Sequence, residues 1–295
     1  MAIYRLKLFT NYPDRRALCL KEGSIAIGWE VDNAVDAEDY LKKATERYGT
    51  DGKLSKGHKD SFDYLKKISE NVKKGIDCYI WVQLDGLDYR LGKVTNDVIT
   101  FDNKLGPKME CDLSEKRKIK FDEVPGKIIG CFVGRGIVLR IVRTDNDLEK
   151  YCEWLYLPKP RPKIHLENFT TLLHPDDLED LAGLYLQEKE KYFIIPSTNK
   201  QGTKHIEYEL RDIHGNKACI QCKTGYSSVD TEKIYKEFEG YTIFVCVMDE
   251  SQNGKYNNTE KKVEEIPFHK LVKWAKDHKN LLPQRIQNYI ELTEN

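Results

Sequence analysis

The sequence predicts an α+β first domain, a small mixed β-barrel with helices on its rim, and an α/β second domain built around a mixed central sheet. Strand-like segments dominate residues 1–156, whereas helical and strand-like segments alternate over residues 164–295. A proline-rich stretch separates the two patterns. The 295 residues are enough for two ordinary domains.

The boundary is predicted at residues 157–163, where prolines occupy alternate positions. Proline cannot continue a helix or a central strand, and a proline-rich segment is extended and stiff. We therefore expect a linker between the two domains. The alternative is a proline-rich surface loop within a single domain.

Alternating and β-branched residues indicate the strands of the first domain. We expect strands over residues 2–9, 24–31, 78–84, 89–95, 98–101 and 127–142, and helices over residues 37–48 and 61–73. Asp85-Gly86 between the third and fourth strands favours a hairpin turn.

The second domain is predicted to begin with an amphipathic helix over residues 175–189, which has Pro175 and acidic residues at its start. Three strands, a second helix and a buried strand follow. We expect these elements over residues 192–196, 205–211, 217–223, 230–238 and 241–248, and two closing helices near 268–278 and 283–292.

Composition excludes some classes of protein. No apolar run is long enough to span a membrane, and the first twenty residues contain no apolar signal core, so we expect a cytoplasmic protein. Lys plus Arg and Asp plus Glu both number 48, so nucleic acid could be bound only through local basic patches.

The eight cysteines are predicted to be buried thiols of a reducing compartment, because most lie in apolar runs. Cys219 and Cys222 form a C-x-x-C pattern. On a strand, an offset of three residues places two side chains on opposite faces. The sequence therefore disfavours a zinc or redox site at this pair.

A candidate hydrolytic site follows from the hairpin predicted around residues 214–216. Side chains of a strand alternate between faces, so Gln221 and Lys223 share a face, and the hairpin can bring Glu207 beside them. A carboxylate, an amide oxygen and the backbone carbonyl of Cys222 suit Mg²⁺. Such a metal neutralises charge during phosphodiester cleavage, and Lys223 could orient the attacking water or hold the phosphate.

Glu207 and the run Gln221-Cys222-Lys223, within this order of elements, resemble the PD-(D/E)xK nuclease superfamily in the Q-x-K form of Mrr-like restriction enzymes. The resemblance covers most of residues 170–250 and implies a further acid on the preceding helix, for which Glu179 is the candidate. The stretch at 196–202 is similar to the loop that precedes the first catalytic acid.

Two residues depart from the family pattern. Gln221 stands where a second acid is usual, which lowers the negative charge of the site. Glu207 stands where an aspartate is expected, and Glu209 is a rival for that position. The alternative to a site is a half-exposed hairpin that carries ordinary surface Glu, Gln and Lys side chains.

Aromatic residues distinguish the first domain. Trp29, Tyr79 and Trp81 could stack a base flipped from a duplex, or they could be core residues of the barrel. Short motifs over about residues 20–142 resemble PUA-related barrels of the EVE and YTH kind, in which an aromatic cage reads a modified base. The resemblance implies that Lys127 and Arg135 contact backbone phosphates.

Together the two halves predict a Mg²⁺- or Mn²⁺-dependent DNA endonuclease of restriction or phage defence, which recognises DNA through its first domain. The resemblance and the need for two cuts imply a homodimer, and RNA as substrate and partner proteins of a defence system stay open. The alternative is a catalytically inactive nucleic-acid-binding or sensing protein that keeps the nuclease fold as a scaffold. No Walker motif is visible, so we expect no ATP hydrolysis.

Overall fold

The computed structural model is a mixed α+β protein with two compact units, residues Met1–Pro162 and Lys163–Asn295. The boundary lies within the segment that the prolines indicate. The structure describes residues 1–9, 11–133, 137–157, 160–165, 172–198, 205–224, 228–248, 251 and 254–293. None of the helices within these ranges is long and apolar enough to cross a membrane.

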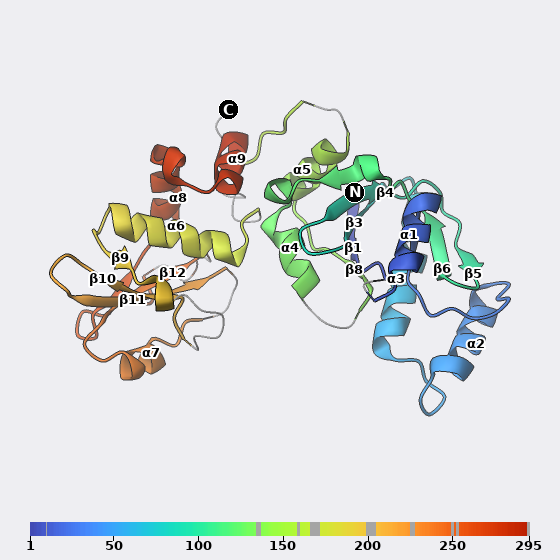
Figure 1. The fold of residues 1–295 in the computed structure, drawn as a ribbon, viewed down its shortest axis with the longest axis horizontal. Coiled ribbons are helices and arrows are strands. Elements are labelled where there is room, and N and C mark those ends of the chain that lie inside the picture. Colours follow the sequence, from blue (N-terminus) through green and yellow to red (C-terminus); the bar gives the residue numbers. More distant parts are fainter. Residues whose placement is uncertain are drawn as a thin grey trace. The chain divides into compact units, whose positions relative to one another are not determined.

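The described part of the first unit forms two sheets (Figure 1). The five-stranded sheet has the order β7-β4-β3-β1-β8, in which β1 and β3 are parallel and the other neighbours are antiparallel. Its strands are β1 (Ala2–Leu6), β3 (Cys78–Gln83), β4 (Tyr89–Lys93), β7 (Lys118–Ile119) and β8 (Leu139–Ile141). The second sheet, β2-β6-β5, consists of β2 (Ser24–Ala26), β5 (Thr100–Asp102) and β6 (Gly106–Glu110).

The helices among the described residues of this unit are α1 (Pro13–Glu22), α2 (Ala37–Tyr48), α3 (Lys56–Lys73), α4 (Gly126–Val133) and α5 (Asn146–Tyr156). Local capping explains where several of them begin. The side chains of Asp36, Ser55 and Asp145 accept hydrogen bonds from the free backbone N–H groups in the first turns of α2, α3 and α5.

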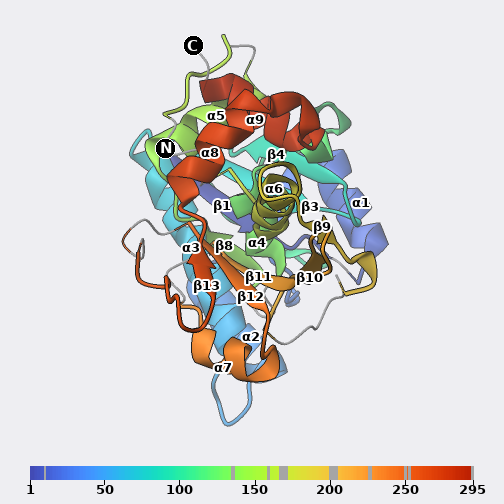
Figure 2. The same cartoon turned by 90° about the vertical axis from the view of Figure 1, so that its left-hand side faces the viewer.

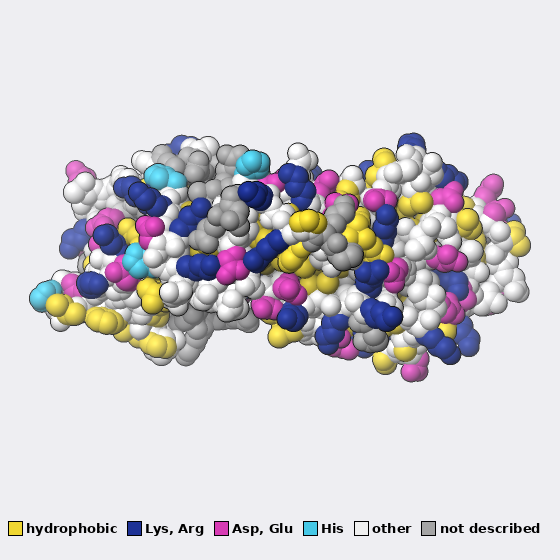
Figure 3. Space-filling model, turned by 90° about the horizontal axis from the view of Figure 1, so that it is seen from above, with side chains coloured by type: hydrophobic (Ala, Val, Ile, Leu, Met, Phe, Trp, Pro, Cys, Tyr) yellow, Lys and Arg dark blue, Asp and Glu magenta, His cyan; other side chains and the backbone are white. Residues whose placement is uncertain are grey.

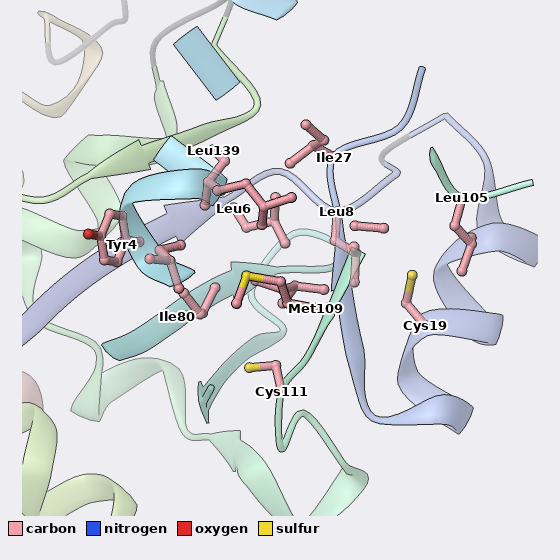
Figure 4. Close-up of a cluster of buried hydrophobic side chains, with 14 of the residues drawn as sticks. Tyr4, Leu6, Leu8, Cys19, Ile27, Ile80, Leu105, Met109, Cys111 and Leu139 are labelled. Carbon is pink, nitrogen blue, oxygen red and sulfur yellow. The ribbon is translucent and has the colours of Figure 1, made fainter. Parts of the chain in front are cut away.

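The main core of the first unit lies between the two sheets and the helices α1, α2 and α3 (Figure 4). Tyr4, Leu6 and Ile80 supply one side from the larger sheet, while Met109 and Cys111 supply another from the strand β6 and its end. A bridge between Val94 and Cys111 connects the two sheets. Apolar burial over this interface is the main driving force for the fold of the unit.

The structure corrects the expected barrel and several of its elements. Neither sheet closes into a barrel within the described residues. The predicted strand at 127–142 is instead the helix α4 followed by the short strand β8, because an apolar run carries no period that separates a strand from a buried helix. Helices α1 and α5 were not predicted.

The described residues of the second unit form a five-stranded sheet with the order β13-β12-β11-β10-β9. Strands β9 (Phe193–Ile194), β10 (Tyr208–Arg211) and β11 (Lys217–Lys223) are antiparallel neighbours, whereas β12 (Thr242–Val247) and β13 (Val263–Glu265) continue the sheet in parallel. The helices are α6 (Pro175–Glu188), α7 (Thr231–Glu237), α8 (Phe268–Asp277) and α9 (Gln284–Thr293).

Helices α6 and α7 cover opposite faces of this sheet (Figures 1 and 2). On the α7 face, Cys219, Ile243 and Val245 form a core with Val229 and Ile234. On the α6 face, the buried residues include Leu178, Leu181, Ala182, Leu210, Ala218, Ile220 and Cys246. The sheet is therefore covered on both sides, and polar groups are exposed mainly at the ends of its strands.

Two contacts fix the position of α6. Gly183 faces β10 so closely that a Cβ atom there would lie 3.1 Å from Tyr208 Cζ and 3.0 Å from Ile194 Cδ1. At the N-terminus of α6, the buried carboxylate of Asp177 accepts hydrogen bonds from Arg285 of α9, one of them 2.9 Å from Nε. The helix is thus held against the sheet near its middle and against α9 near its start.

Candidate active site

Glu207 and Gln221 face each other across the hairpin of β10 and β11. Tyr208 is in register with Ile220, and the backbone N–H of Glu207 donates to Ile220 O at 2.8 Å, which places Glu207 opposite Gln221. Gln221 is 7 % exposed, and its Nε2 donates to Glu207 Oε1 and to the carbonyl oxygen of Cys222, the latter at 3.1 Å. The Cys222 N–H also donates to Glu207 Oε1, at 3.2 Å.

The three groups expected to hold a metal therefore converge on one point. Gln221 Nε2 lies at this point, within hydrogen-bond reach of both oxygens. A half-turn of the amide would present its oxygen there instead, beside the carboxylate of Glu207 and the carbonyl of Cys222. The set would then consist of oxygen atoms, the donors that Mg²⁺ prefers.

Glu179 on α6 reaches the same place from the other side of the sheet edge. Burial, followed by the negative charge of Glu207 and a hydrogen bond with that carboxyl, raises the pKa of Glu179 to about 7. Tyr208 Oη donates to the backbone carbonyl of Glu179 at 2.8 Å, which ties this turn of α6 to β10. Two carboxyl groups thus share a confined space, and a cation would relieve their repulsion.

Lys223 follows Gln221 by two residues at the end of β11, so its side chain leaves the same face of the strand. It is half-buried, and its ammonium group has no hydrogen-bond or ion-pair partner in the described part of the chain.

Glu209, the rival to Glu207 noted in the sequence, has other partners. Glu209, the alternative acid, accepts a hydrogen bond from Tyr241 Oη at 3.0 Å and forms an ion pair with Arg211 at 3.3 Å. Cys219 lies in the core beneath α7, whereas Cys222 is in register with Cys246 on β12. All eight cysteines are free thiols, and seven of them are buried.

The candidate metal ligands include only two charged side chains. Across the described residues, no group of three or more His, Cys, Asp or Glu side chains could hold a metal ion. The candidate set has two carboxylates, an amide and a backbone carbonyl. Such a set fits a hard divalent cation that keeps several water ligands. The segment at 196–202 is described only as far as Thr198.

In the first unit, two of the three expected base-stacking aromatics are core residues. Tyr79 and Trp81 are both 0 % exposed. The ring of Tyr79 meets the edge of Tyr156 at 5.2 Å between centroids, and Trp81 Nε1 donates to Cys152 Sγ at 3.4 Å. Helix α5, which supplies both partners, covers this face of the sheet. The expectation that these two aromatics stack a base is therefore wrong for this structure.

Trp29 does line a cavity, which has a volume of about 560 Å³. Its neighbours in the lining include Phe9, Tyr12, Tyr48, Arg15 and Arg47. The other face of the indole stacks on His58, 4.3 Å away and nearly parallel. We call this space the Trp29 cavity; its aromatic walls suit a planar ring.

The other aromatic residues of the Trp29 cavity could not be predicted from the sequence. Phe9 and Trp29 both have positive φ values, 46° and 56°, a conformation that bulky residues rarely adopt and that no sequence pattern announced. Glu30 forms ion pairs with Arg15 and Arg47 at the rim. Lys127 is partly buried on α4, and Arg135 lies outside the described residues.

A second hollow lies in the second unit, at the opposite ends of the strands from Gln221 and Lys223. It has a volume of about 650 Å³ and is lined by polar side chains that include Asn216, Lys217, Thr242 and Lys262. None of the candidate catalytic groups lines it. This hollow is therefore not part of the candidate active site.

Charge on the surface is mixed, as the equal counts of acidic and basic residues predict. Lys and Arg side chains are interspersed with Asp and Glu over the face drawn in Figure 3.

A scan against protein-family models finds no match for this chain, and a search of curated proteins finds no relative.

Proposed function

We propose that this protein is a metal-dependent endonuclease that cuts DNA in its second unit and recognises it through its first. The observation that carries the proposal is the meeting of Glu207, Gln221 and the Cys222 carbonyl at one point, with Glu179 beside them. The order α6, β9, β10, β11, α7, β12 supports a restriction-endonuclease-like domain.

Each group would have a distinct task. A bound Mg²⁺ or Mn²⁺ supplies the charge that stabilises phosphodiester cleavage. Glu207, the Gln221 amide oxygen and the Cys222 carbonyl would hold the cation. The Glu179 carboxylate would add a second negative charge beside it. Lys223, at the open end of β11, holds the scissile phosphate or positions the attacking water.

The first unit would supply recognition. The Trp29 cavity, large enough for one base, supports a PUA-like role in which a flipped and modified base stacks between aromatic side chains. Tyr79 and Trp81 take no part in this. Cleavage of both strands by one kind of site is most simply achieved by a homodimer.

The test is cleavage of supercoiled plasmid, methylated and unmethylated, by the whole protein with Mg²⁺ or Mn²⁺. We expect nicking or linearisation that EDTA abolishes and that Lys223→Ala lowers at least about a hundredfold, the scale for losing one transition-state contact. Lys236→Ala, an exposed substitution on α7, is the matched control and should cut normally.

One specific feature favours a second candidate, a nucleic-acid sensor without activity. Gln221 replaces the usual second acid, which weakens the attraction of the site for a cation. Intact plasmid under every condition, together with unchanged DNA binding in Lys223→Ala, would support the sensor. Cleavage of RNA of the same sequence, with DNA left intact, would show that the substrate is RNA.

A further inference from the structure

The edge of the larger sheet in the first unit places two arginines opposite each other. Arg5 on β1 is in antiparallel register with Arg140 on β8, so both side chains leave the same face of the sheet. Like charges directly opposite on neighbouring strands destabilise a sheet. Such a pair calls for a compensating negative charge.

No carboxylate of the described residues compensates this pair. Arg5 is only 2 % exposed; its Nη1 donates to Val138 O at 3.0 Å, and its Nε has no hydrogen-bond partner. Burial lowers the pKa of Arg5, and the groups that act on it are the Cys131 thiol and the like charge of Arg140. A buried guanidinium with an unpartnered N–H is costly unless an anion approaches it.

The same basic edge borders the Trp29 cavity. Lys7 follows Arg5 by two residues and lines the cavity together with Val138. The backbone N–H of Lys7 donates to Val138 O at 2.9 Å, which continues the pairing of β1 and β8. Helix α4 contacts β1, and the Cys131 thiol on this helix lies within electrostatic reach of Arg5, Arg140 and Lys127.

We propose that Arg140 and Lys7, with Arg5 beneath them, form a binding site for a phosphate group of the nucleic-acid backbone beside the Trp29 cavity. This proposal rests on the proposed recognition of DNA by the first unit. It adds that the Trp29 cavity binds a nucleotide that is part of a polynucleotide chain, and not a free base. Guanidinium groups suit phosphate because they donate two parallel hydrogen bonds to its oxygens.

The first arm of the test uses inorganic phosphate and the whole protein. Phosphate should raise the midpoint of thermal unfolding above that in sodium chloride of equal ionic strength, since it binds only the folded state. In Arg140→Gln this gain should fall by at least half, while the midpoint in chloride alone should rise because the like-charge pair is gone. Lys67→Gln, an exposed change on α3, should leave both unchanged.

The second arm measures binding of a labelled DNA duplex by fluorescence anisotropy at several salt concentrations. Arg140→Gln should weaken binding about tenfold and reduce the slope of log affinity against log salt by about one, the effect of losing one phosphate contact. Arg140→Lys should restore most of the slope, because it keeps the charge.

The two arms separate the phosphate site from the proposed function. Protection by phosphate that depends on Arg140, without any DNA binding by the wild type, would support the anion site and refute DNA recognition. DNA binding with an unchanged salt slope in Arg140→Gln, and no protection by phosphate, would refute the phosphate site alone.

Discussion

At the scale of single residues, the candidate site depends on two carboxyl groups that occupy one small space. The carboxylate of Glu207 accepts hydrogen bonds from Gln221 Nε2 and from the Cys222 N–H. Glu179, in contrast, is buried beside the negative charge of Glu207, and both effects raise its pKa, to about 7. Glu179 therefore contributes little to the stability of the fold.

The first prediction concerns Glu179→Gln. We expect metal-dependent cleavage to fall about tenfold to a hundredfold, while the free energy of unfolding without metal is unchanged or slightly higher, because a neutral amide removes the repulsion with Glu207. The measurements are initial cleavage rates and urea denaturation in EDTA. Glu190→Gln, exposed just beyond the end of α6, is the control. A large loss of stability would show that Glu179 is a structural residue.

The second prediction concerns pH and His58. Burial lowers the pKa of His58 to about 4, while its ordinary value is 6.5, so the unfolded chain binds more protons between these two values. The contribution of this residue to stability is complete above pH 6.5 and is lost as the pH falls toward 4. Because of His58 alone, we expect the free energy of unfolding to fall by about 2 kcal/mol by pH 4.5. Other titrating groups will change the stability further.

The matched variant for this prediction is His58→Gln, which keeps a donor and an acceptor for the Tyr40 hydroxyl, 2.7 Å from His58 Nε2. The difference in unfolding free energy between wild type and variant should shrink as the pH falls from 6.5 to 4.5. A constant difference across this range would contradict a buried neutral histidine.

At the scale of elements, helix α6 supplies the one group of the candidate site that the hairpin of β10 and β11 does not, Glu179. Strand β11 carries Gln221 and Lys223, whereas Glu179 interacts with Glu207, and the close approach of α6 to β10 at Gly183 makes this possible. The hydroxyl of Tyr208 then binds the carbonyl of Glu179. The separation between this helix and the sheet thus sets the distance between the two carboxyl groups.

The third prediction is that Gly183→Ala destabilises the protein by about 1–3 kcal/mol, the usual cost of overpacking, and impairs cleavage although Gly183 contacts no substrate. Tyr208→Phe removes the hydroxyl next to the added methyl group. The double variant should therefore lose less stability than the sum of the single losses, as measured by urea denaturation. Strict additivity would contradict the close approach of helix and strand.

Some elements could be predicted from the sequence and others could not. The hairpin of β10 and β11 was predictable, since its alternation is local and a turn separates the strands. The barrel was wrong because the apolar run at 127–133 forms α4, and only tertiary packing decides between helix and strand there. Helix α5 could have been found from its Asp145 cap and its apolar spacing.

Missing α5 also explains the error over the aromatics. Tyr79 and Trp81 share a face, as predicted, but α5 covers that face with Cys152 and Tyr156. The Trp29 cavity draws its other walls from segments near residues 9–15 and 47–48, and no local pattern connects these to Trp29. Glu179 was found only through the family resemblance, because its partner is 28 residues away in the chain.

At the scale of the whole molecule, each unit has its own core. The fourth prediction is that heat unfolds the protein in two calorimetric transitions. Ile68→Ala in the first unit and Ile243→Ala in the second, both 0 % exposed in the wild type, should each lower one transition and spare the other. A cost of about 3 kcal/mol is expected for each cavity. A single transition moved equally by both would contradict independent units.

The contacts that close the second unit are made by the last part of the chain. Arg285, which holds the start of α6, comes 108 residues after Asp177, and the N–H of Ile164 donates to the carbonyl of Leu292 at 2.9 Å. During synthesis, the ribosome has therefore released almost the entire second unit before α6 can be fixed against its partners. If the second unit is the nuclease that we propose, its candidate site would be completed only after Arg285 has been synthesised.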